Sequence, residues 1–304
     1  MFVTDPGDFA AAFRSGRFPV RRAATARGAF LVAPASAALA AESSQDNRYM
    51  AATPDVDLDR ALRQHAELAR RLGDDVPALT FPGDPACPDG MFPNNVFATA
   101  SGRLIVGRMR HAVRRREAGR RDIRRFFRDV LGYAETDLSQ RTDLVAELTG
   151  ALVVDRARGI GYCGLSERCD AAGARAMHDA FGLSLTFCFE LAPGEYHTNV
   201  VFALLAGRLP LLAAAGFRDA AVPQAIARAY GDAVWLDDAQ KRAFTGNAIA
   251  LAPARAWMSA RGAAALEPPQ RAAIERHGFA LGDVELDEIE KAGGSLRCCV
   301  AEIF

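Results

Sequence analysis

Short apolar runs alternate with amphipathic helical stretches along almost the whole chain, and this alternation constrains the fold more than any other feature. Short strands in pairs followed by a helix predict an α/β or α+β protein, and no Pro/Ser-rich linker divides it, so we expect a single domain. The expected strands are 29–33, 103–107, 151–155, 183–189, 199–205, 209–213, 233–236, 247–251 and 296–303, and the expected helices are 55–72, 119–131, 170–181, 222–230 and 268–277.

Composition limits the kinds of partner. Half of the 304 residues are apolar, which is enough for a substantial core. Lys plus Arg and Asp plus Glu both number 37, so no net field draws the chain to nucleic acid or to an anionic membrane. Residues 1–27 lack the apolar core of a secretory signal, and no later segment is apolar for the length of a membrane span. We therefore expect a cytoplasmic protein with a small-molecule substrate and no nucleic-acid or membrane partner, and the oligomeric state stays open.

The cysteines and the missing motifs argue against bound cofactors. Six cysteines are too few for a disulfide scaffold of this length, and none has the CxxC spacing of a zinc site. The nucleotide-binding patterns GxGxxG and GxxxxGK[ST] are both absent. We expect no cofactor and no metal, which leaves the cysteines as inert core residues or as a reactive thiol.

Four polar segments interrupt the apolar pattern and carry the residue types that a thiol hydrolase needs: 88–95, 147–150, 195–199 and 293–299. In the last, a Gly-Gly-Ser turn delivers Cys298 onto an expected strand, and glycine permits close approach of a ligand to the backbone. The adjacent Cys299 would then point to the opposite face. A tight turn with both cysteines packed as small hydrophobes is the alternative interpretation.

Two further residues are candidates for acid–base chemistry. His197 precedes an apolar run, at a junction where functional side chains often lie, although a lone histidine there is more often structural. Glu147 has apolar neighbours on both sides, and a buried carboxylate needs a partner because burying an unpaired charge costs several kcal/mol.

Five motifs occur in one order along residues 30–304: Asp-x-x-Phe-x-x-Asn from residue 89, Glu-x-Thr-Gly from 147, Gly-x-Ser-x-Arg from 164, His-Thr-Asn-Val from 197 and Gly-Gly-Ser-x-Arg-Cys from 293. Each motif alone is weak, but together they resemble the pentein, or guanidino-modifying, superfamily. Its members include dimethylarginine dimethylaminohydrolase, arginine deiminase and the citrulline-utilising and arginine-deiminase-related bacterial proteins.

The resemblance implies a fold and a catalytic set. It implies a five-bladed β/α propeller with pseudo-fivefold symmetry over residues 28–304, preceded by an N-terminal extension, residues 1–27. It makes Cys298 the nucleophile, His197 the general acid and base, and Glu147 the carboxylate that orients or charges the histidine.

By the same resemblance, Asp89, Asn94 and Asn95 lie against the guanidinium of the substrate, and Phe92 supplies an apolar wall. Asn95 replaces an aspartate that is common in dimethylarginine hydrolases. Because an amide donates as well as accepts, Asn95 favours a ureido group such as that of citrulline. A simple turn after Pro93 is the alternative interpretation.

Arg168 and Arg114 match positions at which relatives hold the α-carboxylate of the substrate, and the planar guanidinium suits a carboxylate. Ala33 stands where close relatives have arginine, which leaves the far end of the substrate open. For the arginine-rich stretch 108–128, a solvated helix face and a nucleic-acid surface are the alternatives, and the zero net charge disfavours the second. The acidic loop 42–47 would close over the site as in relatives.

The sequence therefore predicts a C–N hydrolase that acts on the guanidino or ureido group of arginine, citrulline, a methylarginine or succinylarginine through a covalent cysteine intermediate. Whether one or two ammonia molecules leave stays open. An amidinotransferase that uses an amine acceptor is one alternative. A non-catalytic pentein that serves as a binding module is the other, which the joint presence of Cys298, His197 and Glu147 disfavours.

Overall fold

The computed structural model describes residues 1–19, 22–51 and 55–304, and the strands of this part form five sheets. From one edge to the other, the four-stranded sheet consists of β1 (Phe2–Val3), β9 (Leu185–Glu190), β8 (Ile160–Leu165) and β7 (Leu152–Asp155). The four three-stranded sheets, again from edge to edge, consist of β10 (Phe202–Leu205), β11 (Leu209–Ala213) and β12 (Val234–Leu236); β13 (Ile249–Ala252), β14 (Arg255–Ser259) and β15 (Ala280–Val284); β16 (Ala301–Ile303), β2 (Gly28–Val32) and β3 (Ala78–Phe81); and β4 (Phe97–Ala100), β5 (Arg103–Val106) and β6 (Ala134–Asp137).

One connection pattern recurs in all five sheets. One strand of each sheet pairs antiparallel with one neighbour and parallel with the strand that follows it in the chain: β8, β11, β14, β2 and β5. In the four-stranded sheet, β1 adds a second parallel pair at the edge of β9. A parallel pair needs a crossover, and helices supply it. These are α2 (Leu58–Leu72) before β3, α4 (Arg121–Arg125) with the π-helical turn η4 (Phe126–Val130) before β6, α6 (Ala171–Phe181) before β9, α8 (Ala221–Tyr230) before β12 and α11 (Pro268–Arg276) before β15. The protein is therefore a mixed α/β fold, as the sequence predicted.

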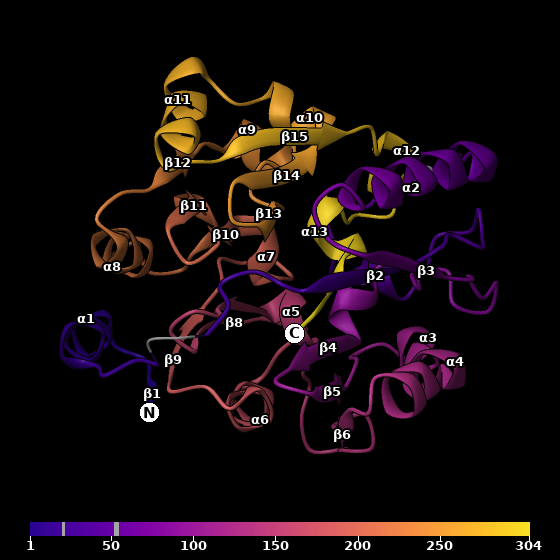
Figure 1. The fold of residues 1–304 in the computed structure, drawn as a ribbon, viewed down its shortest axis with the longest axis horizontal. Coiled ribbons are helices and arrows are strands. Elements are labelled where there is room, and N and C mark those ends of the chain that lie inside the picture. The colour runs from indigo at the N-terminus through magenta and orange to yellow at the C-terminus, as the bar shows by residue number, and fades with distance from the viewer. Residues whose placement is uncertain (20–21, 52–54) are drawn as a thin grey trace.

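Short helical turns enter four of the sheets. They are η2 (Pro93–Asn95) before β4, α5 (Leu148–Ala151) before β7, α7 (Thr198–Val201) before β10 and α13 (Leu296–Cys299) before β16. The sheets surround a centre in which α5, α7 and α13 lie (Figure 1), and η2 contacts both α5 and α13. The polar motifs of the sequence thus converge at one place.

Eight further helices and helical turns lie outside these crossovers and entering turns in the described part of the chain. They are α1 (Pro6–Ser15), η1 (Ser43–Gln45), α3 (Ala112–Arg115), η3 (Glu117–Gly119), η5 (Ala214–Gly216), α9 (Asp238–Arg242), α10 (Ala260–Ala264) and α12 (Asp287–Glu290). No helix in the described ranges is both long and apolar enough to span a bilayer.

The N-terminal residues pack on the rest of the chain. Strand β1 pairs with β9, and the fully buried Phe9 of α1 stacks on Phe187 with ring centroids 4.5 Å apart. Both rings belong to the largest apolar cluster, which runs from α1 through β8, β9, β10 and β11. Residues 20–21 of the predicted extension 1–27 lie outside the described residues.

Three expected strands begin on helical turns. The first residue of the predicted strand 151–155 is the last residue of α5. The predicted strand 199–205 begins as α7, and the predicted strand 296–303 begins as α13. In α13 the amides of Cys298 and Cys299 both donate to the carbonyl of Ser295, at 3.0 and 3.3 Å. The two cysteines therefore do not face opposite sides of a strand, because they lie on a helical turn where successive residues point about 100° apart. An apolar run cannot distinguish a buried turn from a buried strand.

Candidate functional site

A narrow cavity opens between the helical turns at the centre of the fold. It holds about 280 Å³ of non-atom space, open solvent at its mouth included. Its walls come from the loop 43–47, the segment 89–95, α3, and the loops before α6, α7 and α13, and consist of Ser43, Asn47, Asp89, Phe92, Asn95, Arg114, Arg168, Tyr196, Ala292, Gly293, Gly294 and Cys298. Six residues that the sequence singled out therefore share one cavity: Asp89, Phe92, Asn95, Arg114, Arg168 and Cys298.

Cys298 lies buried in the cavity wall and accepts from two amides. The Nδ2 atoms of Asn247 and Asn199 lie 3.4 and 3.8 Å from its Sγ. The side-chain oxygen of Asn247 also accepts from the backbone amide of Arg297 at 2.9 Å, which fixes the start of α13. Burial raises the pKa of the Cys298 thiol, although the bonds to Ser295 and Asn247 and the charges of Arg297 and Arg114 oppose the rise. The thiol is therefore held in place but is mostly protonated at neutral pH until a cation or a base assists it.

His197 and Glu147 form a fully buried pair beside the cavity. His197 Nε2 lies 2.9 Å from Glu147 Oε2, and His197 Nδ1 has no partner among the described residues. Burial would raise the pKa of Glu147, but the charge of Arg168 and the bond to His197 outweigh it and hold this pKa well below its usual range. Burial lowers the pKa of His197 despite the opposing effect of Glu147. A carboxylate at Nε2 keeps the proton there, so Nδ1 carries the free lone pair of the neutral ring.

Gly150 connects this pair to the cavity. A Cβ at residue 150 would lie 2.6 Å from the side-chain oxygen of Asn95 and 2.8 Å from His197 Nδ1. Because Asn95 lines the cavity, the unpartnered nitrogen of His197 lies next to the wall, although His197 and Glu147 do not themselves line it. The structure thus brings the predicted catalytic residues into one buried region.

The predicted head-group residues leave polar atoms without partners. Asp89 accepts from the hydroxyl of Ser43 through Oδ2 at 2.5 Å, while its Oδ1 has no partner in the described part of the chain. The side-chain oxygen of Asn95 and both amide atoms of Asn94 are also buried and unpartnered there. Asn94 is fully buried but does not line the cavity; its carbonyl accepts from Thr149 at 3.0 Å. Because unpaired buried polar atoms are costly, Asp89 Oδ1 and the Asn95 oxygen mark where a polar ligand would bind.

The predicted carboxylate-binding arginines already have acidic partners. Arg168 donates through Nε to Asp46 Oδ1 at 2.9 Å and lies 3.3 Å from Glu147 Oε2. Arg114 donates to both oxygens of Glu117, at 2.9 and 2.8 Å. Burial raises the pKa of Glu117 to about 7, although Arg114 opposes the rise. The interpretation of residue 114 as part of a solvated helix face is wrong, because its side chain is only 3% exposed.

The acidic loop 42–47 lies against this site. Ser43 and Asn47 line the cavity, Asn47 Nδ2 donates to the carbonyl of Gly293 at 3.2 Å, and Asp46 lies 3.0 Å from His111 Nε2. This agrees with the expectation that the loop covers the site.

Sequence reasoning missed Asn247, which contacts Cys298 from the one sheet that no helical turn enters. An internal repeat could have pointed to Asn247, because Thr245-Gly246 before β13 repeats Thr149-Gly150 before β7. Asp46 was missed as a partner of Arg168 because the two are 122 residues apart in the chain.

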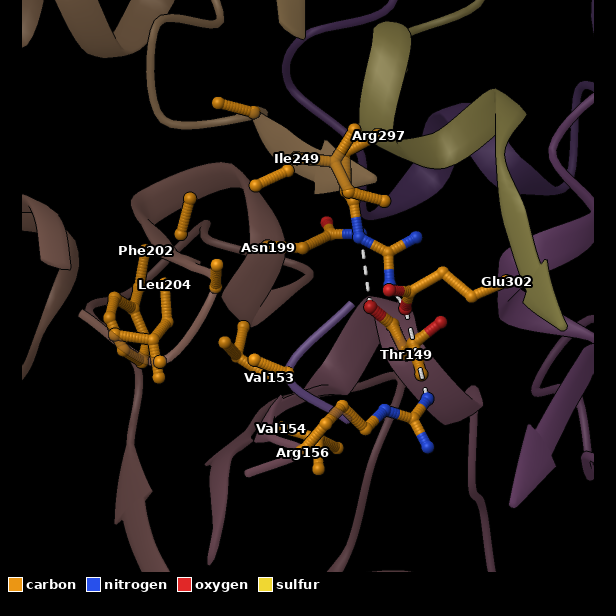
Figure 2. Close-up of a pocket in the computed structure, with 16 residues that line it drawn as sticks. Thr149, Val153, Val154, Arg156, Asn199, Phe202, Leu204, Ile249, Arg297 and Glu302 are labelled. Atoms are coloured by element: carbon orange, nitrogen blue, oxygen red, sulfur yellow. Dashed lines mark hydrogen bonds and ion pairs between the residues drawn. The ribbon is translucent and has the colours of Figure 1, made fainter. Parts of the chain in front are cut away.

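A second cavity lies beside the same turns (Figure 2), with about 530 Å³ of non-atom space that includes open solvent at its mouth. Thr149, Asn199 and Arg297 contribute to its walls, together with Arg156, Glu302 and apolar residues of β7, β10 and β13.

Comparison with known proteins assigns the chain to a family. A family model described as N,N dimethylarginine dimethylhydrolase, eukaryotic, matches residues 33–304. The chain belongs to this family. The match confirms the predicted superfamily, and with it an enzyme that hydrolyses C–N bonds in linear amidines. No curated protein sequence matches the chain.

Solved structures resemble the fold at low sequence identity. The N-terminal domain of ArgZ, an arginine dihydrolase from the ornithine-ammonia cycle in Cyanobacteria, has a TM-score of 0.78 at 18% identity, covering 91% of this chain and 97% of that domain. Unliganded AgrE also has a TM-score of 0.78, at 19% identity, and the match covers 91% of this chain but only 39% of AgrE. A dimethylarginine dimethylaminohydrolase adduct with 4-chloro-2-hydroxymethylpyridine has a TM-score of 0.69 at 21% identity, covering 91% and 99%. At these identities the likeness establishes the fold alone.

Proposed function

We propose that this enzyme hydrolyses the guanidino or ureido group of an arginine-like amino acid, with Cys298 as nucleophile, His197 as general acid and base, and Glu147 as the carboxylate that orients the histidine. The observation that carries the proposal is the shared cavity, in which Cys298 and the unpartnered oxygens of Asp89 and Asn95 meet. Two buried acceptors in the same cavity as a buried thiol suit a planar amidine with several N–H groups.

In the first half-reaction, the Cys298 sulfur attacks the central carbon of the guanidinium. His197 Nδ1 takes the thiol proton and delivers it to the departing nitrogen, which leaves as ammonia or as an amine. A cationic substrate beside the thiol favours the thiolate, which offsets the effect of burial on the Cys298 pKa. A thiouronium remains on the sulfur.

In the second half-reaction, His197 accepts a proton from water, and the oxygen of that water bonds to the thiouronium carbon. The carbon–sulfur bond then breaks while the new hydroxyl loses its proton to solvent and becomes the carbonyl of the ureido product. Protonated His197 returns its proton to the departing Cys298 sulfur, which restores the resting pair. Glu147 holds the Nε2 proton throughout, so that only Nδ1 changes its protonation state.

The substrate proposal follows from Asn95. Its amide can donate to a ureido oxygen, which an aspartate would repel, so we propose citrulline or a conversion of arginine through citrulline as the reaction. The description of ArgZ as an arginine dihydrolase supports a double hydrolysis. Phe92 would pack against the plane of the head group, and Arg168 and Arg114 would contact the substrate carboxylate if their acidic partners shift.

We also propose that the five sheets are the blades of a five-bladed propeller that forms one domain over residues 28–304. The recurring connection pattern and the arrangement of the sheets in Figure 1 support this proposal. A cytoplasmic location remains a prediction.

The test is release of ammonia or amine from arginine, citrulline, dimethylarginine and N-succinylarginine. The proposal expects turnover of citrulline, or two ammonia molecules per arginine. Product appearing only with an added amine acceptor would identify an amidinotransferase, and no turnover of any of the four, with Cys298 unreactive, would identify a binding module.

A further inference from the structure

The second cavity carries a charge imbalance. Two arginines share one carboxylate there: Arg297 donates to Glu302 at 3.0 Å, and Arg156 Nη2 lies 3.7 Å from the same oxygen. Figure 2 shows the two guanidinium groups on either side of Glu302. Among the described residues, Arg156, Arg297 and Glu302 are the charged ones that line the cavity, so this lining has a net charge of one positive unit.

Arg156 has few direct protein partners, and its remaining N–H groups keep contact with solvent. Its side chain is only 10% exposed, yet among the described residues it makes a single hydrogen bond, from Nη1 to the carbonyl of Thr99 at 2.9 Å. Its guanidinium lies over the ring of Phe304 at 4.1 Å, and burial together with the charge of Arg297 lowers the pKa of Arg156 to about 10. The guanidinium of Arg156 therefore has N–H groups free of protein partners, which an anion that displaces solvent could accept from.

The cavity also has a shape and an approach that suit a ligand. Val153, Phe202 and Ile249 give it apolar walls; in Figure 2 Phe202 lies away from the two guanidinium groups, whereas Ile249 lies beside Arg297. Arg156 and Val154 line both this cavity and a neighbouring surface pocket, which offers a way in.

We propose that this second cavity binds a small oxyanion, a carboxylate or a phosphate, through Arg156 and Arg297. The site is separate from the proposed substrate cavity, because Arg156, Arg297 and Glu302 do not line that cavity.

Occupancy of the site is expected to affect catalysis, because its walls continue into the catalytic segments. Thr149 follows Glu147 by two residues, Asn199 follows His197 by two, and Arg297 directly precedes Cys298. Asn199 also donates to Cys298 Sγ at 3.8 Å. An anion that draws Arg297 away from Glu302 would therefore shift the turn that holds the thiol.

The test measures the affinity of the full-length protein for inorganic phosphate and for propionate by calorimetry, with chloride at matched ionic strength as the reference. The two probes distinguish a phosphate from a carboxylate with an apolar tail. Arg156→Gln should weaken binding at least about tenfold, as expected for the loss of a charged hydrogen bond. Glu302→Gln should strengthen binding, because it frees both arginines. Arg141→Gln, which removes an exposed partner of Asp143, is the matched control and should bind as the wild type does.

The opposite signs of the two variants separate a binding site from a structural ion cluster. If Arg156→Gln does not fold, the gain in Glu302→Gln still tests the site. Equal affinities in wild type, Arg156→Gln and Glu302→Gln, or no phosphate or propionate binding above chloride, would overturn the proposal. Saturating anion should change the rate of Cys298 alkylation several-fold, and an unchanged rate would overturn the coupling to catalysis.

Discussion

Gly150 offers a perturbation that leaves every proposed catalytic group in place. Its Cβ position lies 2.6 Å from the Asn95 side-chain oxygen and 2.7 Å from His197 Cε1, about 0.7 Å short of ordinary van der Waals contact for the ring. Gly150→Ala must therefore push the His197 ring or the Asn95 amide aside. Overpacking of this kind costs about 1–3 kcal/mol, partly offset by the better helix propensity of alanine, which is worth roughly 1 kcal/mol.

The effect on turnover should be larger than the effect on stability. A displacement approaching 1 Å at a catalytic group costs on the order of 10²-fold, so we expect kcat/KM for ammonia release to fall about 10- to 100-fold. Gly119→Ala is the matched control, because Gly119 is exposed and a Cβ there meets no atom within 4 Å. Coupled-enzyme ammonia assays and thermal unfolding would be measured on both variants. Wild-type kcat/KM in a folded Gly150→Ala protein would refute the proposed placement of His197 and Asn95.

Three further outcomes are expected. His197→Ala and Glu147→Gln should each lower kcat by orders of magnitude, and the double variant should be little worse than the poorer single one; additive losses would make Glu147 structural. Asn95→Asp should shift relative kcat/KM from citrulline towards arginine by roughly tenfold or more, and unchanged selectivity would refute the ureido argument. Because burial raises the Cys298 pKa above the usual 9.0, iodoacetamide labelling of the free enzyme should rise with pH to a midpoint above 9, and a midpoint near 7 would contradict this environment.

The sequence predicted the five crossover helices and nine of the sixteen strands in the described part of the chain, because burial patterns are local, but it missed β1, β3, β4, β6, β8, β14 and β15. The strand expected at 29–33 is β2, and the helix expected at 170–181 is α6, which begins after Asp170 and ends at Gly182 in the left-handed region. The boundaries failed at α7 and α13, where a buried turn and a buried strand share one apolar run. Only tertiary contacts, such as the bond from Arg297 to Asn247, decide between them.

The site could be predicted in part for the same reason. Motif order identified the segments that hold Cys298 and Asp89, whereas long-range pairing is invisible in a single sequence. The ion pair between Arg114 and Glu117 could be predicted, because the two residues are three apart on a helical stretch. The burial of Arg114 could not be predicted, because it depends on the distant carbonyls of Asp89 and Phe92, to which Arg114 Nη2 donates at 3.3 and 3.2 Å.

The central claim is that Cys298 forms a covalent intermediate with the substrate. Acid quenching during turnover of arginine or citrulline, followed by peptide mass spectrometry, tests it most directly, with Cys298→Ser and Cys299→Ser as paired variants. We predict an adduct on Cys298 that retains the amino-acid chain, a thiouronium with the mass of arginine less ammonia or the corresponding thiocarbamate from citrulline. The adduct and the activity should both be lost in Cys298→Ser and retained in Cys299→Ser. An adduct on Cys299, or an active Cys298→Ser protein, would contradict the account.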